Sequence, residues 1–188
     1  MKKISSRISR DKFQISKIKK IAKNIKLLIL DVDGVMTDGR IILDNEGNEF
    51  KAFHVRDGHG IKMAVKAGIN VAVITGRTSK VVERRAKELG ITEIYQGTFR
   101  KSVIYESLLQ KYKCKDESVA FMGDDVVDIG LLKRVGLSAV PADADEETKK
   151  WAAFVSSKEG GRGAVREFIE LILKSSKLWD KVSGEFIG

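Results

Sequence analysis

Short apolar runs alternate along the chain with segments of helical periodicity. Residues 27–30 are four consecutive apolar residues, which is typical of a parallel strand covered on both faces. Further strands are predicted at residues 71–74, 94–97, 119–122, 137–140 and 154–155. Helices are predicted at residues 60–67, 79–89, 101–112, 126–134, 146–152 and 163–178. This alternation predicts an α/β fold with a doubly wound parallel sheet.

Residues 39–54 interrupt this rhythm. Two short apolar stretches flank Asp44-Asn45-Glu46-Gly47, which has the chemistry of a tight turn, so the segment predicts an inserted β-hairpin. An exposed apolar strand edge of this kind promotes aggregation unless another chain covers it. Since closed symmetry avoids fibres, we expect the hairpin to lie in an interface between copies of the chain.

The net charge of +9 is concentrated at one end of the 188-residue chain. Residues 1–26 hold ten Lys and Arg against one Asp, and the remainder is neutral. We therefore divide the chain into a basic amphipathic extension (1–24), one α/β domain (25–178) and a tail (179–188). We interpret the extension as a helix docked on the body or on a neighbouring subunit. An anionic membrane surface or a nucleic acid is the alternative, and we expect no nucleic-acid partner.

Composition narrows the compartment and the kind of metal site. No apolar run approaches the roughly 20 residues of a membrane span, and residues 1–23 lack the apolar core and cleavage site of a signal peptide. The single cysteine, Cys114, excludes an intramolecular disulfide and a thiolate-rich zinc site. The chain has two histidines, His54 and His59, which argues against a histidine-based metal site. We expect a cytoplasmic protein without a membrane span.

The candidate chemistry lies where the apolar strands end. Asp31 and Asp33 follow the first strand, and in an open α/β sheet ligands bind beyond the carboxyl ends of the strands. Two neighbouring carboxylates both stay ionised when a cation lies between them, and such oxygen ligands suit Mg²⁺. Thr75 and Asp124 also follow strands, and Lys101 begins a helix. Read singly, Thr75 is a strand-end cap and Lys101 a surface lysine, although basic residues are disfavoured at helix N-termini.

Four motifs in order carry a resemblance to a known superfamily. Residues 31–38, Asp-Val-Asp-Gly-Val-Met-Thr-Asp, resemble motif I of the haloacid dehalogenase superfamily of phosphatases. Residues 71–77, Lys101 and residues 119–128 resemble motifs II, III and IV. Finer features at residues 54–58, 75–77 and 160–167 are similar to one branch, the 3-deoxy-D-manno-octulosonate 8-phosphate (KDO 8-phosphate) phosphatases. The likeness runs from about residue 25 to 173.

The resemblance implies a capless, Rossmann-type three-layer fold and a Mg²⁺-dependent phosphatase that releases KDO in lipopolysaccharide precursor biosynthesis. It implies that Asp31 is the nucleophile and forms an aspartyl phosphate, and that Asp33 is the general acid and then the base. Asp31, Asp33 through its carbonyl, and Asp124 would hold the metal, while Thr75 and Lys101 would hold the phosphoryl oxygens. Asp125 and Asp128 would orient Lys101 and the water ligands. The hairpins would join four subunits in a homotetramer.

The same resemblance assigns a set of residues to the sugar-acid phosphate substrate. They are Asp33, His54, Val55, Arg56, Asp57, Gly58, Lys62, Arg77, Arg85, Lys101 and Arg162. Lys62 departs from the Arg expected there, and Lys cannot make the planar bidentate pair with a carboxylate. Arg162 lies in a Gly-rich loop that could read the sugar in place of a cap, or could simply start the last helix.

Three alternatives differ in substrate or class. A phosphatase of a nine-carbon 2-keto sugar-acid 9-phosphate keeps the chemistry, but its members tend to carry acidic residues at the positions of Arg77 and Arg162. A signalling receiver also uses Asp, Thr and Lys around a parallel sheet, but lacks the Asp-x-Asp pair. A catalytically silent assembly module of the same fold would not need intact Asp31 and Asp33.

Overall fold

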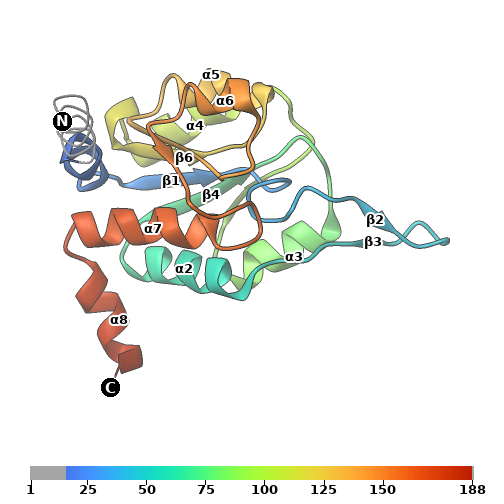
Figure 1. Ribbon diagram of the computed structural model, residues 1–188, viewed down its shortest axis with the longest axis horizontal. Helices are drawn as coiled ribbons and strands as arrows, with labels where there is room; N and C mark the ends of the chain where they lie inside the picture. Colours follow the sequence, from blue (N-terminus) through green and yellow to red (C-terminus); the bar gives the residue numbers. More distant parts are fainter. Residues whose placement is uncertain (1–15, 188) are drawn as a thin grey trace, which may run out of the picture.

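The computed structural model describes residues 16–187. Its centre is a six-stranded, all-parallel sheet with the strand order β5-β4-β1-β6-β7-β8 (Figure 1). The strands are β1 (Leu27–Leu30), β4 (Asn70–Ile74), β5 (Glu93–Tyr95), β6 (Val119–Met122), β7 (Leu137–Val140) and β8 (Phe154–Val155). The predicted doubly wound parallel sheet is confirmed.

Helices cover both faces of the sheet (Figure 1). One layer contains α2 (Val55–Lys66), α3 (Lys80–Glu88) and α7 (Ala164–Ser175). The other contains α4 (Lys101–Tyr112), α5 (Ile129–Leu132) and α6 (Glu146–Lys149), with the short 3₁₀ turns η1 (Asp116–Ser118) and η2 (Val126–Asp128). Leu28 and Leu30 of β1 pack toward the first layer, and Leu27 and Ile29 toward the second. Because both faces of β1 are covered, all four residues are apolar and fully buried.

The hairpin projects from the body beside this sheet (Figure 1). Its strands, β2 (Ile42–Leu43) and β3 (Glu49–Phe50), are antiparallel. The Asp44 carboxylate accepts hydrogen bonds from the backbone of Glu46 and Asn48 and so stabilises the turn. Apart from this hairpin, only α2 lies between β1 and β4, so this described segment of the chain holds no cap domain.

Two sequence-based boundaries were wrong, and one segment had no predicted secondary structure. Helix α2 begins at Val55 instead of residue 60. Gly58 and Gly60 lie inside the helix, where the side chains of Arg85 and Arg166 pack closely against them, so these glycines do not end the helix. The segment 126–134 divides into η2 and α5. The predicted tail is the helix α8 (Trp179–Ile187), and its Trp179 ring contacts Arg166 and Lys174.

Part of the basic extension lies against the body. Residues 16–22 are helical, Ala22 is fully buried, and Ile18 and Ile21 pack on the core beside it. This agrees with the docked-helix interpretation for that segment, while residues 1–15 of the extension lie outside the described residues. Among the described helices, none has the length and apolar character needed to cross a bilayer.

A carboxylate on α2 joins this helix to α7. Asp57 is 3% exposed and accepts hydrogen bonds from the backbone N of Gly163 (3.1 Å) and Arg166 (2.7 Å) at the start of α7. Burial raises the pKa of Asp57, and these two N–H groups oppose that rise. Asp57 therefore caps α7 from a neighbouring helix.

We predict that Asp57→Ala lowers the free energy of unfolding by about 1–3 kcal/mol, because two buried N–H groups lose their acceptor. Asp57→Asn keeps an acceptor oxygen and is expected to lose less. Urea unfolding of the three proteins measures the difference. An unchanged midpoint for Asp57→Ala would contradict the capping role.

Candidate active site

Strand register brings the predicted catalytic residues to one edge of the sheet. Leu30 pairs with Val73 of β4 on one side and with Met122 of β6 on the other. Asp31 follows directly, and its N–H donates to the Met122 carbonyl at 3.0 Å. β1 is where the strand order reverses, and in such sheets ligands bind at this switch point.

A cavity of about 300 Å³ opens at this edge. Seven residues predicted from the sequence line it: Asp31, Asp33, Thr75, Arg77, Lys101, Asp124 and Asp125. Gly34, Gly39, Gly76, Phe99 and Val127 complete the lining. The four motifs, far apart in the chain, therefore meet in one place.

Lys101 is buried between two carboxylates. Its Nζ lies 2.6 Å from Asp128 Oδ1 and 3.0 Å from Asp31 Oδ1, and the residue is 3% exposed. Burial alone would lower the pKa of Lys101, but the two carboxylates outweigh it and raise the pKa. The contact with Asp31 is an ion pair without hydrogen-bond alignment, since Asp31 Oδ1 has no hydrogen-bond partner among the described residues. Lys101 is thus a fixed cation beside Asp31.

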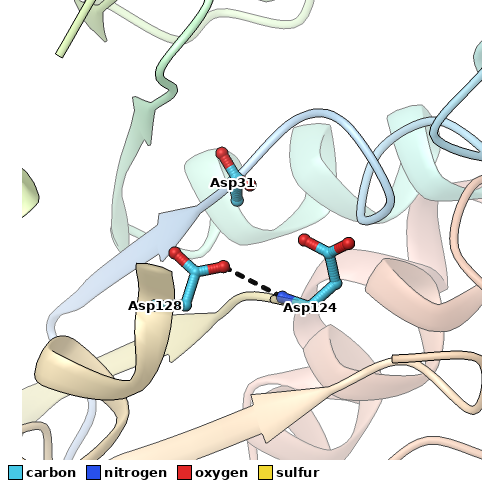
Figure 2. A group of neighbouring side chains, drawn as sticks. All are labelled: Asp31, Asp124 and Asp128. Carbon is cyan, nitrogen blue, oxygen red and sulfur yellow. Dashed lines mark hydrogen bonds between the residues drawn. The ribbon is translucent and has the colours of Figure 1, made fainter. Parts of the chain in front are cut away.

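Three carboxylates crowd the same point, with ligand atoms of Asp31, Asp124 and Asp128 all within 4.8 Å of one another (Figure 2). Burial raises the pKa of Asp31 to about 6, with Lys101 opposing. Burial and then the charges of Asp31 and Asp128 raise the pKa of Asp124 to about 8. Such repulsion is relieved by a divalent cation, which favours the ionised form of each acid.

The hydrogen bonds divide these acids by role. Asp128 uses Oδ1 for Lys101 and Oδ2 for the backbone N of Asp124 (Figure 2) and of Asp125. Asp128 is thereby committed to Lys101 and the backbone, whereas Asp31 and Asp124 remain the carboxylates able to hold a metal, and their predicted metal role stays a prediction. Gly34 makes the approach possible, because a Cβ at this position would lie 2.0 Å from Asp124 Oδ2. The donor set fits Mg²⁺, which prefers carboxylate and carbonyl oxygens.

Asp33 has neighbours that the sequence analysis missed. Lys51, just after β3, donates to its Oδ1, and Arg77 Nε lies 3.7 Å from its Oδ2. Arg77 also donates to Glu49 at 3.0 Å. The charged–apolar–charged alternation of Glu49, Phe50 and Lys51 indicates that the two charged side chains point inward together. The sequence does not indicate which element they contact.

The other predicted substrate residues lie elsewhere in the single chain. His54, Arg56 and Arg162 line a separate cavity of about 610 Å³. Asp57, Gly58 and Arg85 border a third, small cavity. Val55 and Lys62 are exposed on α2. The substrate roles of these residues stay predictions.

The Gly-rich loop packs against the loop after β1. A Cβ on Gly160 would lie 1.8 Å from the Gly34 carbonyl oxygen, so only glycine fits. Gly161 has a φ of +62°, and its N–H donates to Val35 O at 2.9 Å. Arg162 has a side chain 63% exposed and pairs with Glu159. The loop supports the site through its backbone, and Gly163 is also the N-cap residue of α7.

Comparisons with known proteins agree with this geometry. The family profile of haloacid dehalogenase-like hydrolases matches residues 87–169. The chain is 50% identical over 163 residues to a KDO 8-phosphate phosphatase of Yersinia pestis, covering 87% of this chain and 86% of that protein. The corresponding enzyme of Escherichia coli K12 is 48% identical over 166 residues, covering 88% of each chain.

Solved structures give the same result. The crystal structure of a KDO 8-phosphate phosphatase from Yersinia pestis superposes with a TM-score of 0.86 at 48% identity, covering 87% of this chain and 89% of that chain. The enzyme from Moraxella catarrhalis, solved in complex with a magnesium ion, a phosphate ion and a KDO molecule, superposes with a TM-score of 0.88 at 41% identity. That match covers 90% of this chain and 97% of the other.

We predict that the protein binds Mg²⁺ more tightly as the pH rises from 6 to 9. The pKa values of about 6 for Asp31 and about 8 for Asp124 mean that protons compete with the metal below those values, so binding releases protons. Calorimetric titration in two buffers of different ionisation enthalpy measures both affinity and proton release.

Asp124→Asn is expected to weaken Mg²⁺ binding at pH 8 at least tenfold, about 1.4 kcal/mol. The matched change Asp180→Asn on α8 serves as the control. Unaltered affinity in Asp124→Asn would remove Asp124 from the metal site.

Proposed function

The chain belongs to the KDO 8-phosphate phosphatase family of the haloacid dehalogenase-like hydrolases, and we propose its function from this membership. It is a Mg²⁺-dependent phosphoric monoester hydrolase that converts KDO 8-phosphate to KDO and phosphate. The observation that carries this function is the meeting of Asp31, Asp33, Thr75, Lys101 and Asp124 in one cavity.

The first half of the reaction transfers the phosphoryl group to the protein. A carboxylate oxygen of Asp31 attacks phosphorus, and the bond from phosphorus to the sugar oxygen breaks as the aspartyl phosphate forms. Asp33 gives a proton to the departing sugar oxygen, which would otherwise leave as a strongly basic alkoxide. The sugar acid then dissociates.

The second half returns the protein to its starting state. A water molecule attacks the phosphorus of the aspartyl phosphate, and Asp33, now ionised, takes its proton. The bond between phosphorus and the Asp31 oxygen breaks, and inorganic phosphate leaves with Asp31 and Asp33 restored.

Charge in the cavity makes both steps feasible. We assign Lys101, held as a cation by Asp128, and the Thr75 hydroxyl to the phosphoryl oxygens, where charge is spread in the transition state. Asp31, Asp124 and the carbonyl of Asp33 would hold Mg²⁺, which would supply further positive charge against an anionic substrate. Asp125 borders the cavity and is assigned to the metal's water ligands.

Selection of a sugar-acid substrate needs more side chains than those that line the catalytic cavity. Arg77 is half-exposed at the catalytic cavity, and its guanidinium suits the sugar-acid carboxylate. His54, Arg56 and Arg162 line another cavity, and no cap covers the first one. We assign these residues to the active site of a neighbouring subunit in a homotetramer, where they would roof the sugar.

The exposed hairpin supports this assembly. Ile41, Ile42, Leu43 and Phe50 are 41–59% exposed, and an apolar edge of this kind is stabilised by pairing with copies of itself in a closed ring. With KDO as product, we place the protein in the cytoplasm and in lipopolysaccharide precursor biosynthesis.

The function predicts a preference for sugar acids over neutral sugars. Phosphate release from KDO 8-phosphate should exceed that from a hexose phosphate by at least tenfold in kcat/KM, about 1.4 kcal/mol of transition-state binding. Asp31→Asn should abolish turnover of both and keep the melting temperature, while Asp180→Asn keeps the activity.

A panel that includes a nine-carbon sugar-acid 9-phosphate and an EDTA-treated sample decides the substrate and metal assignments. Equal kcat/KM values for acid and neutral sugars would reject the carboxylate-reading role.

The assembly predicts a second result. Light scattering of the wild type should give the mass of a tetramer. Replacing Ile41-Ile42-Leu43 with Ser-Thr-Ser should give monomers or dimers with reduced activity, because each site loses its roof. Val103→Ser removes an apolar side chain that is 61% exposed on α4 and is the matched control. A fully active wild-type monomer would defeat the assembly proposal.

A further inference from the structure

We propose that Lys51, supported by Glu49, is a positioning residue that fixes the orientation of the Asp33 carboxylate for proton transfer. The proposal rests on the proposed function, in which Asp33 is the acid and base. It gives the inner face of the hairpin a part in the chemistry, in addition to the outer face that a neighbouring subunit would cover.

The alternation of the strand separates the two faces. Phe50 is 54% exposed, whereas the residues on either side of it direct their side chains to the body: the Glu49 side chain is 17% exposed and that of Lys51 is 1% exposed. Successive side chains in a strand point to opposite faces. Glu49 and Lys51 therefore form an inward-facing pair at the base of the hairpin.

A lysine is almost never this buried unless its charge is paired. The Lys51 ammonium donates to Asp33 Oδ1 and lies 3.5 Å from Glu49 Oε1. Asp33 is 18 residues earlier in the chain and on another loop, so this contact ties the hairpin to the loop after β1.

Glu49 is itself fixed from a third element. It accepts hydrogen bonds from Arg77 at 3.0 Å and from the Ser79 hydroxyl. Ser79 is the N-cap of α3, and its Oγ accepts from Val82 N at 3.3 Å. The segment between β4 and α3, which begins with Thr75, therefore holds Glu49 in place, and Glu49 limits where the Lys51 ammonium can lie.

The contacts treat the two oxygens of Asp33 differently. Oδ1 receives the Lys51 ammonium, whereas the nearest cation to Oδ2 is Arg77 Nε at 3.7 Å, beyond hydrogen-bond distance. Because Lys51 fixes Oδ1, rotation of the carboxylate is restricted and Oδ2 stays available to exchange a proton. A general acid must lie within hydrogen-bond reach of the atom that it protonates, so this restraint bears directly on the rate.

The test compares two substrates, of which only one has a leaving group that Asp33 must protonate. KDO 8-phosphate releases an alkoxide and depends on Asp33, whereas p-nitrophenyl phosphate releases a weakly basic phenolate that needs no proton. Lys51→Met, which keeps most of the side-chain volume, is expected to lower kcat on KDO 8-phosphate at least tenfold with KM within threefold. The first-turnover burst of p-nitrophenolate should stay within about threefold of the wild type, because phosphoryl transfer to Asp31 is intact.

Three further variants complete the set. Asp33→Asn is the reference and should show the same dependence on the leaving group. Glu49→Gln should show it to a smaller degree, and it tests the proposal if Lys51→Met does not fold. Lys87→Met removes a surface lysine paired with Glu83 on α3 and should behave as the wild type. The Mg²⁺ affinity and the oligomeric mass of Lys51→Met should be unchanged.

Each other outcome overturns the positioning role. Equal losses of rate on the two substrates would indicate a general structural effect. A rise in KM alone would make Lys51 a substrate-binding residue. Full activity of both Lys51→Met and Glu49→Gln would make the pair irrelevant to catalysis. If the wild type itself releases phosphate from neither substrate, the proposed function fails, which is a distinct result.

Discussion

Repulsion between buried carboxylates at one edge of the sheet is the constraint on which this structure depends. Parallel pairing of β1 with β6 puts Asp31 and Asp124 side by side, and η2 brings in Asp128. Because all three lie within 4.8 Å of one another, each must have a cation or an N–H donor to stay ionised. Lys101 and the backbone of Asp124 and Asp125 neutralise Asp128, so the remaining negative charge is directed toward a metal.

The hairpin shows how one short element can serve assembly and chemistry together. A strand presents alternate side chains to opposite sides, so Phe50 can meet a neighbouring subunit while Glu49 and Lys51 meet Asp33 and Arg77. In the proposed tetramer, pairing of the outer face would limit the motion of the inner face. The same contacts that hold the subunits together would then hold the general acid.

The parts of this molecule set by local pattern could be predicted from the sequence. The fully buried β1 is an apolar run in the sequence, and residues that follow apolar strands lie at the sheet edge. This pattern alone predicts that Asp31, Thr75 and Asp124 lie together. Contacts between distant segments could not be predicted. No sequence feature singled out Lys51 as a partner of Asp33. The capping of α7 by Asp57 could not be predicted either, because the position of Asp57 relative to α7 depends on helix packing. No helix was predicted over residues 179–187, although this segment is amphipathic.

Backbone contacts explain how the edge stays fixed without a cap domain. The Asp124 carboxylate lies where a Gly34 side chain would be, and Gly160 lies against the Gly34 carbonyl. The loops after β1 and β8 therefore meet backbone to backbone, and the loop after β6 reaches Gly34 through the Asp124 carboxylate. The Gly160 N–H also donates to Asp143 Oδ1 at 2.8 Å, which joins the loop after β7. A close-packed backbone leaves few alternative arrangements. The orientation of the catalytic side chains is therefore built into the loops themselves, and in the proposed tetramer only the sugar would remain to be enclosed by a second copy of the chain.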